Sequence, residues 1–189
     1  MTWDLVTAKA KIGLSPTDTT QDFLLQTSLD TALALAEKYC DRFFLQATES
    51  VKFYHTHYDK FQLRRYPIQV VNKVSEAGDF KVHGTVGWLE FDRPVIAEEL
   101  QIDYVGGYAV LPNDLELALW GIFDNVYANF TASGGATVSG SIKKLAITGV
   151  GSVDYDTSSG TTVNLTGGFG GLIPAMGLAI LELYRLESA

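Results

Sequence analysis

The sequence contains very little cysteine and little charge. Its single cysteine, Cys40, among 189 residues excludes an internal disulfide framework and a zinc site built from several thiolates. Charged residues make up only 19% of the chain, and the formal net charge is −8. Because carboxylates repel phosphates, this balance argues against the wrapping of nucleic acid by a basic face. An acidic surface is compatible both with ordinary solubility and with a passage that DNA traverses without sticking.

Signals for secretion and membrane insertion are also missing. The N-terminus lacks a basic region followed by an apolar run, so we expect no signal peptide. The longest apolar stretch, near residues 172–186, is shorter than the roughly 20 residues that span a bilayer. We therefore expect no membrane association, and synthesis in a cytoplasm.

The familiar catalytic motifs do not occur. The sequence has no Gly-x-Ser-x-Gly and no His-Glu-x-x-His, and the glycine run at 167–171 lacks the Lys-Ser/Thr of a phosphate-binding loop. Glu98, Glu99 and Asp103 are candidate acid and base groups, but paired carboxylates at a strand edge are usually solvated. We predict no catalytic residue and no cofactor, and hence no enzyme.

Two alternatives to a structural role stay open on the sequence. His55 and His57 alternate on a predicted strand, so both imidazoles would point to one face and bind a metal if His83 or a carboxylate joined them. That arrangement would suit a metal-dependent hydrolase, although histidines on a polar sheet face are the simpler interpretation, and we predict no metal site. A carbohydrate-binding β-module would instead expose aromatic side chains such as Trp88 and Phe91.

The stretch 102–130 organises the predicted core. It reads as a short strand, a Gly-Gly-Tyr turn, a stop at Pro112 and a long helix that Asn113 can cap. Large apolar side chains recur at three- and four-residue spacing and share one helix face: Leu115, Leu119, Ile122, Phe123, Val126, Tyr127 and Phe130. Gly121 in mid-helix costs about 1 kcal/mol against alanine, which indicates close backbone packing or simple tolerance.

The other elements predict an α+β fold, a small helical bundle core with antiparallel strands. Helices are expected over 3–14, capped by Thr7, over 20–43 and over 173–186, and strands over 50–58, 61–65, 68–75, 88–91 and 100–105. Lys38, Asp41 and Arg42 are interpreted as a solvated helix end, and Arg64-Arg65 as a local ion pair. The predicted domains are a core over 1–130, an arm over 131–171 and a docking helix over 172–189.

The last third of the chain differs in kind. Residues 131–171 hold ten of the eighteen glycines and alternate weakly, as in a protruding β-hairpin arm followed by a hinge at 167–171. The helix after the hinge is apolar on nearly every side, so it needs cover on several sides. Docking on another subunit and folding back on its own core both satisfy that need.

Several motifs in this order resemble one family. They are the helix end 36–42, Ala-Glu-Lys-Tyr-Cys-Asp-Arg; the strand start 66–71, Tyr-Pro-Ile-Gln-Val-Val; Tyr-Val-Gly-Gly-Tyr at 104–108 with Leu-Pro-Asn-Asp-Leu at 111–115; and the closing Leu181, Tyr184 and Arg185. Together they are similar to the head–tail connector, or adaptor (head-completion), proteins of tailed bacteriophages. The segment 131–171 is longer and richer in glycine than this resemblance requires.

The resemblance implies a non-enzymatic virion protein, assembled in the host cytoplasm. It would form a homo-oligomeric ring, of twelve subunits in this family, at the neck, and join the portal protein to the tail or a stopper protein. Viral DNA would pass its channel during packaging without sequence-specific binding. A tail-completion or tail-terminator protein is the alternative in the same setting. The expected portal-docking residues are Leu178, Leu181, Tyr184 and Arg185, and the expected subunit or tail contacts are Lys143, Lys144, Ile147, Val153 and Tyr155.

Overall fold

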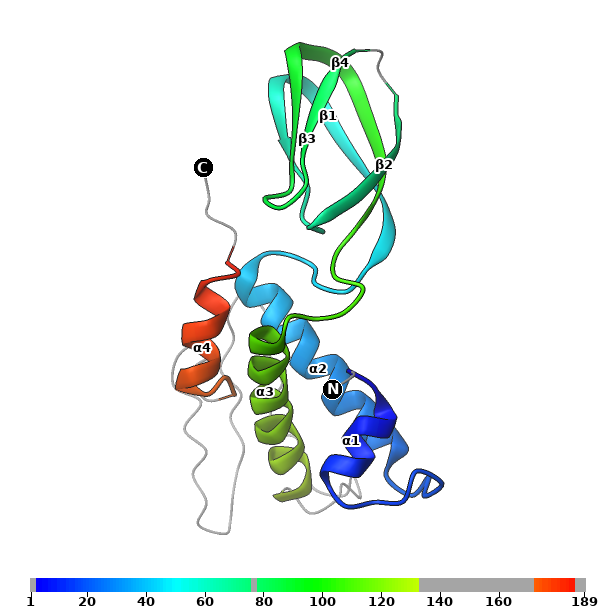
Figure 1. Ribbon diagram of the computed structural model, residues 1–189, viewed down its shortest axis with the longest axis vertical. Coiled ribbons are helices and arrows are strands. Elements are labelled where there is room, and N and C mark those ends of the chain that lie inside the picture. Colours follow the sequence, from blue (N-terminus) through cyan, green and yellow to red (C-terminus); the bar gives the residue numbers. More distant parts are fainter. Residues whose placement is uncertain (1–2, 76–77, 133–171, 186–189) are drawn as a thin grey trace, which may run out of the picture. The chain divides into compact units, whose positions relative to one another are not determined.

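The computed structural model describes residues 3–75, 78–132 and 172–185. Helices and an antiparallel sheet together confirm the predicted α+β class (Figure 1). In chain order the elements are α1 Leu5–Lys11, α2 Asp22–Cys40, β1 Ala47–Gln62, β2 Ile68–Val74, β3 Phe80–His83, β4 Trp88–Gly106, α3 Asn113–Ala132 and α4 Ala175–Glu182. No helix in the described ranges is long and apolar enough to cross a membrane.

The described chain divides into two compact units. A helical unit contains residues 3–39, 113–132 and 172–184, and a sheet unit contains residues 40–75, 78–112 and Arg185. The sheet unit is therefore inserted between α2 and α3, and the predicted 1–130 core holds both units. The predicted arm lies outside the described residues, apart from the last two residues of α3.

The sheet unit is built around β4. The strand order is β1-β4-β2, and β3 also pairs with β4. β1 runs antiparallel to β4 from Ala47 opposite Gly106 to Gln62 opposite Trp88, with a register shift between Tyr58 and Lys60. The predicted strand 50–58 thus continues through Phe61 and Gln62, because a bulge lets pairing pass the polar break. The predicted strand 61–65 was wrong beyond these two residues, since β1 ends at Gln62.

β4 also joins two segments that were predicted separately, 88–91 and 100–105. Pro94 lies between them, and the pairings described for β4 place no Cα partner opposite residues 92–94. Proline has no N–H to donate, so this unpaired stretch tolerates it without loss of a ladder hydrogen bond. The sequence predicted an end to the first segment at Phe91, whereas the pairing on either side of residues 92–94 carries the strand through.

Glycines 106 and 107 lie where separate chain segments approach closely. A Cβ on Gly106 would fall 2.1 Å from the Arg65 carbonyl oxygen, and one on Gly107 would fall 2.5 Å from the Leu45 carbonyl oxygen. Gly107 also has a φ of 92°, a conformation that favours glycine. The Gly-Gly-Tyr run is therefore required by close packing inside the sheet unit.

The apolar side of the sheet forms one buried cluster. Its members come from β1, the connection between β1 and β2, β2 and β4: Phe61, Leu63, Tyr66, Ile68, Leu89, Phe91, Leu100, Ile102 and Tyr104. The Tyr104 hydroxyl donates to Glu49 Oε2 at 3.1 Å and accepts from the Arg65 N–H at 3.2 Å. Burial raises the pKa of this phenol above its usual value.

α3 is the centre of the helical unit, as its periodicity predicts. Leu115, Leu119, Ile122 and Phe123 are fully buried, and Val126 nearly so. The stripe ends there: Tyr127 is half-buried and donates to Gln21 Oε1 at 2.6 Å, and Phe130 is exposed. The prediction that Phe130 belongs to the core was wrong, because no described neighbour covers the last turn of α3.

The predicted cap of the first helix was also wrong. Asp4 is the N-cap of α1, and its Oδ1 accepts from the Thr7 N–H at 2.7 Å. Thr7 is thus the third residue of α1, and its backbone N–H is the donor that the Asp4 side chain satisfies.

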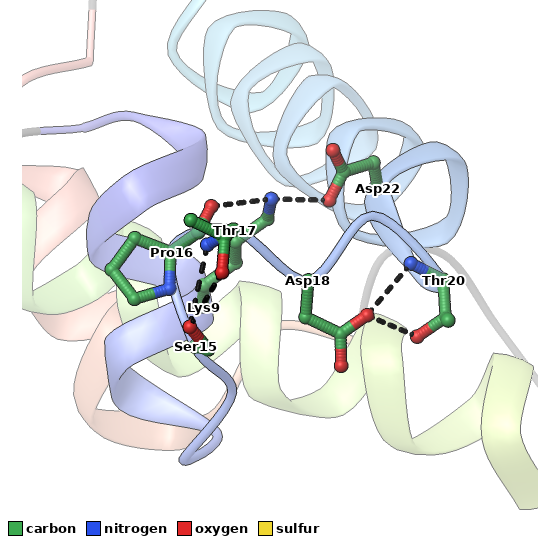
Figure 2. A network of polar contacts seen from close by, with 7 residues as sticks. All are labelled: Lys9, Ser15, Pro16, Thr17, Asp18, Thr20 and Asp22. Carbon is green, nitrogen blue, oxygen red and sulfur yellow. Dashed lines mark hydrogen bonds and ion pairs between the residues drawn. The ribbon is translucent and has the colours of Figure 1, made fainter.

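The connection between α1 and α2 is held by a buried lysine. Figure 2 shows Lys9, which is 4% exposed, reaching the Pro16 carbonyl oxygen at 3.2 Å and Asp22 Oδ1 at 2.6 Å. Nearby, Asp18 Oδ1 accepts from the N–H and the hydroxyl of Thr20 at 2.9 and 2.7 Å. These contacts orient the first turn of α2 against α1.

The variant Lys9→Met should lower the free energy of unfolding by about 2 kcal/mol, because the Pro16 carbonyl and the Asp22 carboxylate lose their partner inside the fold. Urea denaturation measures this effect. Lys11→Met is the matched control on the same helix. Its ion pair with Asp124 is partly exposed, so the control should lose less than about 1 kcal/mol. Equal losses from the two variants would contradict a structural role for the buried ammonium.

Candidate interaction surfaces

The terminal helix α4 packs on α3 within the same chain (Figure 1). A Cβ on Gly121 of α3 would lie 3.3 Å from Pro174 Cγ, and one on Gly177 of α4 would lie 3.7 Å from the Ala118 carbonyl oxygen. Small residues on both helices therefore allow close approach. This contact decides between the two interpretations of Gly121 in favour of packing.

Apolar burial and hydrogen bonds both hold the terminal segment in place. Ile173 is 2% exposed and Leu181 is fully buried. The Tyr184 hydroxyl donates to Asp114 Oδ1 at 2.7 Å, and the Asn125 amide donates to the Leu172 carbonyl oxygen at 3.2 Å. The Tyr39 hydroxyl of α2 also hydrogen-bonds Glu182.

The predicted docking residues consequently differ in accessibility. Leu181 is buried in its own chain, Leu178 and Tyr184 are half-buried, and Arg185 is exposed. Sequence analysis missed Leu183, whose side chain is 79% exposed immediately after α4. The predicted contacts Lys143, Lys144, Ile147, Val153 and Tyr155 lie outside the described residues.

A groove of about 190 Å³ lies between α3 and α4, beside the end of α1. Leu117 and Met176, 52% and 60% exposed, contribute to its lining together with Trp120, Gly121, Pro174 and Ile180. Lys11 and Asp124 supply its charged residues and pair with each other at 2.7 Å. The groove is mostly apolar and suits the side chain of a protein partner better than a polar ligand.

The sheet unit does not bring the predicted histidines to one face with Val51 and Phe53. His55 has a φ of 51°, and the alternation changes there, so that His55 and His57 are exposed while Thr56 is 3% exposed. The Thr56 hydroxyl donates to the Val95 carbonyl oxygen at 3.0 Å. Within the described part of the chain, no three His, Cys, Asp or Glu side chains form a metal-binding group.

His83 also has a local partner. Its Nε2 lies 2.8 Å from Glu90 Oε2, and Lys60 Nζ lies 3.1 Å from the other carboxylate oxygen. Hydrogen bonds from Lys60 and His83 lower the pKa of Glu90. The three residues form a cross-strand surface cluster in which β1 and β3 flank β4.

The candidate carboxylates are surface groups. Glu98 and Glu99 are exposed, and Glu99 pairs with Lys52 at 2.7 Å. Asp103 accepts hydrogen bonds from Gln101 and Ser50, and these lower its pKa. Each carboxylate with a described partner is bound to a neighbouring strand residue, which fits sheet surface chemistry better than catalysis.

The arginines of the sheet unit serve the fold. Arg64 pairs with Asp41 at 3.4 Å and Arg65 with Glu49 at 3.0 Å, so the predicted local ion pairs are confirmed. The prediction that Arg42 is solvated was wrong. Arg42 is 4% exposed, and its guanidinium carbon lies 3.4 Å from the centre of the Tyr66 ring, a geometry that stabilises the buried cation.

Charge is distributed unevenly between the units. Among the described residues, the helical unit has nine acidic and three basic side chains, a net charge of −6. The described part of the sheet unit has nine of each and is neutral. The net negative charge of the described residues therefore lies on the helical unit.

No protein-family model matches the sequence, and no curated protein matches it. The fold, however, is similar to that of a chain in the neck of an empty GTA particle computed with C6 symmetry, with a TM-score of 0.59 and 15% identity. A chain of the virion of a native gene transfer agent particle has a TM-score of 0.59 and 13% identity, and a chain of the native neck computed with C12 symmetry has 0.55 and 15%. Each likeness covers 98% of this chain and 90% of the other.

Proposed function

We propose that the protein is a non-enzymatic neck component of a phage-type particle. In this proposal a ring of twelve copies joins the portal protein to the tail or a stopper protein. The observation that carries the proposal is the fold shared over 98% of this chain with a chain from the neck of a GTA particle. The motifs at 36–42, 66–71 and 104–115, which resemble head–tail connectors, support it independently of the fold.

The uneven charge supports a role for the helical unit at the DNA passage. A net charge of −6 on its described residues would repel phosphates and let DNA pass without binding. Residues 131–171 would interlock subunits or meet the tail.

Electron microscopy of the purified chain, alone and mixed with the portal protein of the same particle, tests the assignment. We expect closed rings stacked coaxially on the portal. A chain that stays monomeric in both samples would contradict the proposal.

Within this proposal the end of the terminal segment docks on the portal. Leu178, Tyr184 and Arg185 remain accessible in the predicted docking set, and the exposed Leu183 adds an apolar contact immediately after α4. Leu181 contributes indirectly, because its burial against the helical core fixes the direction of this segment. The portal would thus contact a surface that is already ordered in the single chain.

The double variant Leu183→Asp with Arg185→Glu should weaken portal binding at least about tenfold, because it places carboxylates at an apolar and a basic contact. Surface plasmon resonance on immobilised portal rings measures the change. Tyr54→Asp, which alters a side chain that is 63% exposed in the sheet unit, is the control and should bind as the wild type does. Unchanged binding by the double variant would refute this docking surface.

A further inference from the structure

Phe23 is the most exposed large apolar side chain among the described residues, at 86%. It stands on the first turn of α2, directly after Asp22, which Lys9 holds in the arrangement of Figure 2. An exposed aromatic side chain on a fixed helix turn loses little conformational freedom when it is buried by a partner. Phe23 is therefore suited to act as the inserted residue of a protein interface.

The groove between α3 and α4 matches such a side chain in size and chemistry. Its volume is about 190 Å³, and apolar cavities of about 150 Å³ accommodate benzene. Leu117 and Met176 already expose more than half of their surface there. Phe23 is not part of the groove lining of its own chain, so insertion of this side chain would join two molecules.

We infer that Phe23 of one copy inserts into the α3–α4 groove of the next copy. The inference rests on the proposed ring and identifies one contact between its subunits. The inserted residue and its receiving groove are different patches of one chain, so the contact is heterologous. Heterologous contacts close into rings when the rotation between subunits allows it.

The distribution of charge on the helical unit favours this orientation. Gln26 and Asp30 share the exposed α2 face with Phe23 at helical spacing, and Gln26 donates to Asp30 Oδ1 at 2.9 Å. The charged residues of the groove, Lys11 and Asp124, pair with each other at 2.7 Å, so the groove lining carries no net charge. Two strongly acidic units repel each other in most orientations, whereas this one brings the carboxylate of Asp30 towards a part of the helical unit without net charge.

Two complementary variants test the contact. Phe23→Asp removes the inserted ring and keeps the groove, and Met176→Asp charges the groove and keeps the ring. Each variant alone should weaken self-association by roughly 30-fold in sedimentation velocity, as for loss of an interface hot spot. An equimolar mixture should give heterodimers but no rings, because only one productive contact can form. Val6→Asp, an equal charge change at a 58% exposed position of α1 outside the groove lining, should assemble as the wild type does.

A photo-crosslinking experiment tests the same contact for the case in which the chain forms rings only on the portal. Benzoylphenylalanine at position 23, in a mixture of isotopically light and heavy protein with portal, should link to residues 117–121 or 174–180 of another copy. Links to other sites, or no link between copies, would overturn the inference. Normal rings from both aspartate variants would also overturn it and leave the ring proposal intact. Failure of the wild-type chain to form rings with or without portal would overturn both.

Discussion

Replacing Gly106 with alanine should lower the free energy of unfolding by about 3 kcal/mol or more. The new Cβ would lie 2.1 Å from the Arg65 carbonyl oxygen and 2.9 Å from its carbonyl carbon, so backbone must move. Both segments are tied to the sheet: Gly106 ends β4 opposite Ala47, and the Arg65 N–H donates to the buried Tyr104 hydroxyl. Relief of the clash therefore disrupts pairing or packing elsewhere in the unit.

Gly78→Ala is the control for this substitution. Its Cβ would meet Phe91 Cδ1 at 3.7 Å, an ordinary van der Waals distance, so stability should change by less than about 0.5 kcal/mol. Trp88 is the tryptophan of the sheet unit, and its fluorescence in a variant with Trp3 and Trp120 changed to phenylalanine follows urea unfolding of that unit. A Gly106→Ala protein as stable as the control would show that the close approach is absent in solution.

Truncating Leu181 to alanine should cost about 2–5 kcal/mol, as for other fully buried leucines. Leu181 is 0% exposed where α4 meets α3, and the glycines at 121 and 177 bring the two helices too close for easy rearrangement. The lost side chain leaves a cavity in the helical unit. Urea denaturation of the isolated chain, followed by fluorescence of Trp120, measures the effect.

Leu183→Ala is the matched control, two residues further on and 79% exposed. It should change stability by less than about 0.5 kcal/mol. If both leucine variants were as stable as the wild type, the terminal helix would not pack on its own chain before assembly. The two leucine variants therefore distinguish packing of the terminal helix on its own chain from docking on another subunit.

The elements with a strong local pattern were predictable. The apolar stripe of α3 recurs at helical spacing, and five of its seven members are buried. The sequence predicted a turn at Gly106 and Gly107. The structure shows that the carbonyl groups of Arg65 and Leu45 leave no space for a Cβ at these two positions. Cys40 is buried, as a lone cysteine on an apolar helix side suggests.

The misses share a cause in long-range packing. Arg42 lies in a charged stretch that is typical of a solvated helix end. In the folded protein, however, the rings of Phe44, Tyr66 and Tyr108 lie close to its guanidinium group. The alternation over 50–58 predicted that His55 and His57 share a face with Val51 and Phe53, whereas the left-handed backbone at His55 reverses the side on which the following residues lie. The residues next to Arg42 and His55 in the sequence predict neither the aromatic partners of Arg42 nor the left-handed backbone at His55.

The sequence by itself determined the α+β class, the position of the central helix and the absence of familiar catalytic motifs, because periodicity and composition act locally along the chain. Its connector-like motifs, not its composition, suggested a neck protein. Only the tertiary structure decided that the sheet forms a separate unit, that the net charge of the described chain lies on the helices, and that Leu181 is buried in its own chain. The reason is physical: an apolar surface must be covered, but only the three-dimensional arrangement decides which segment covers it.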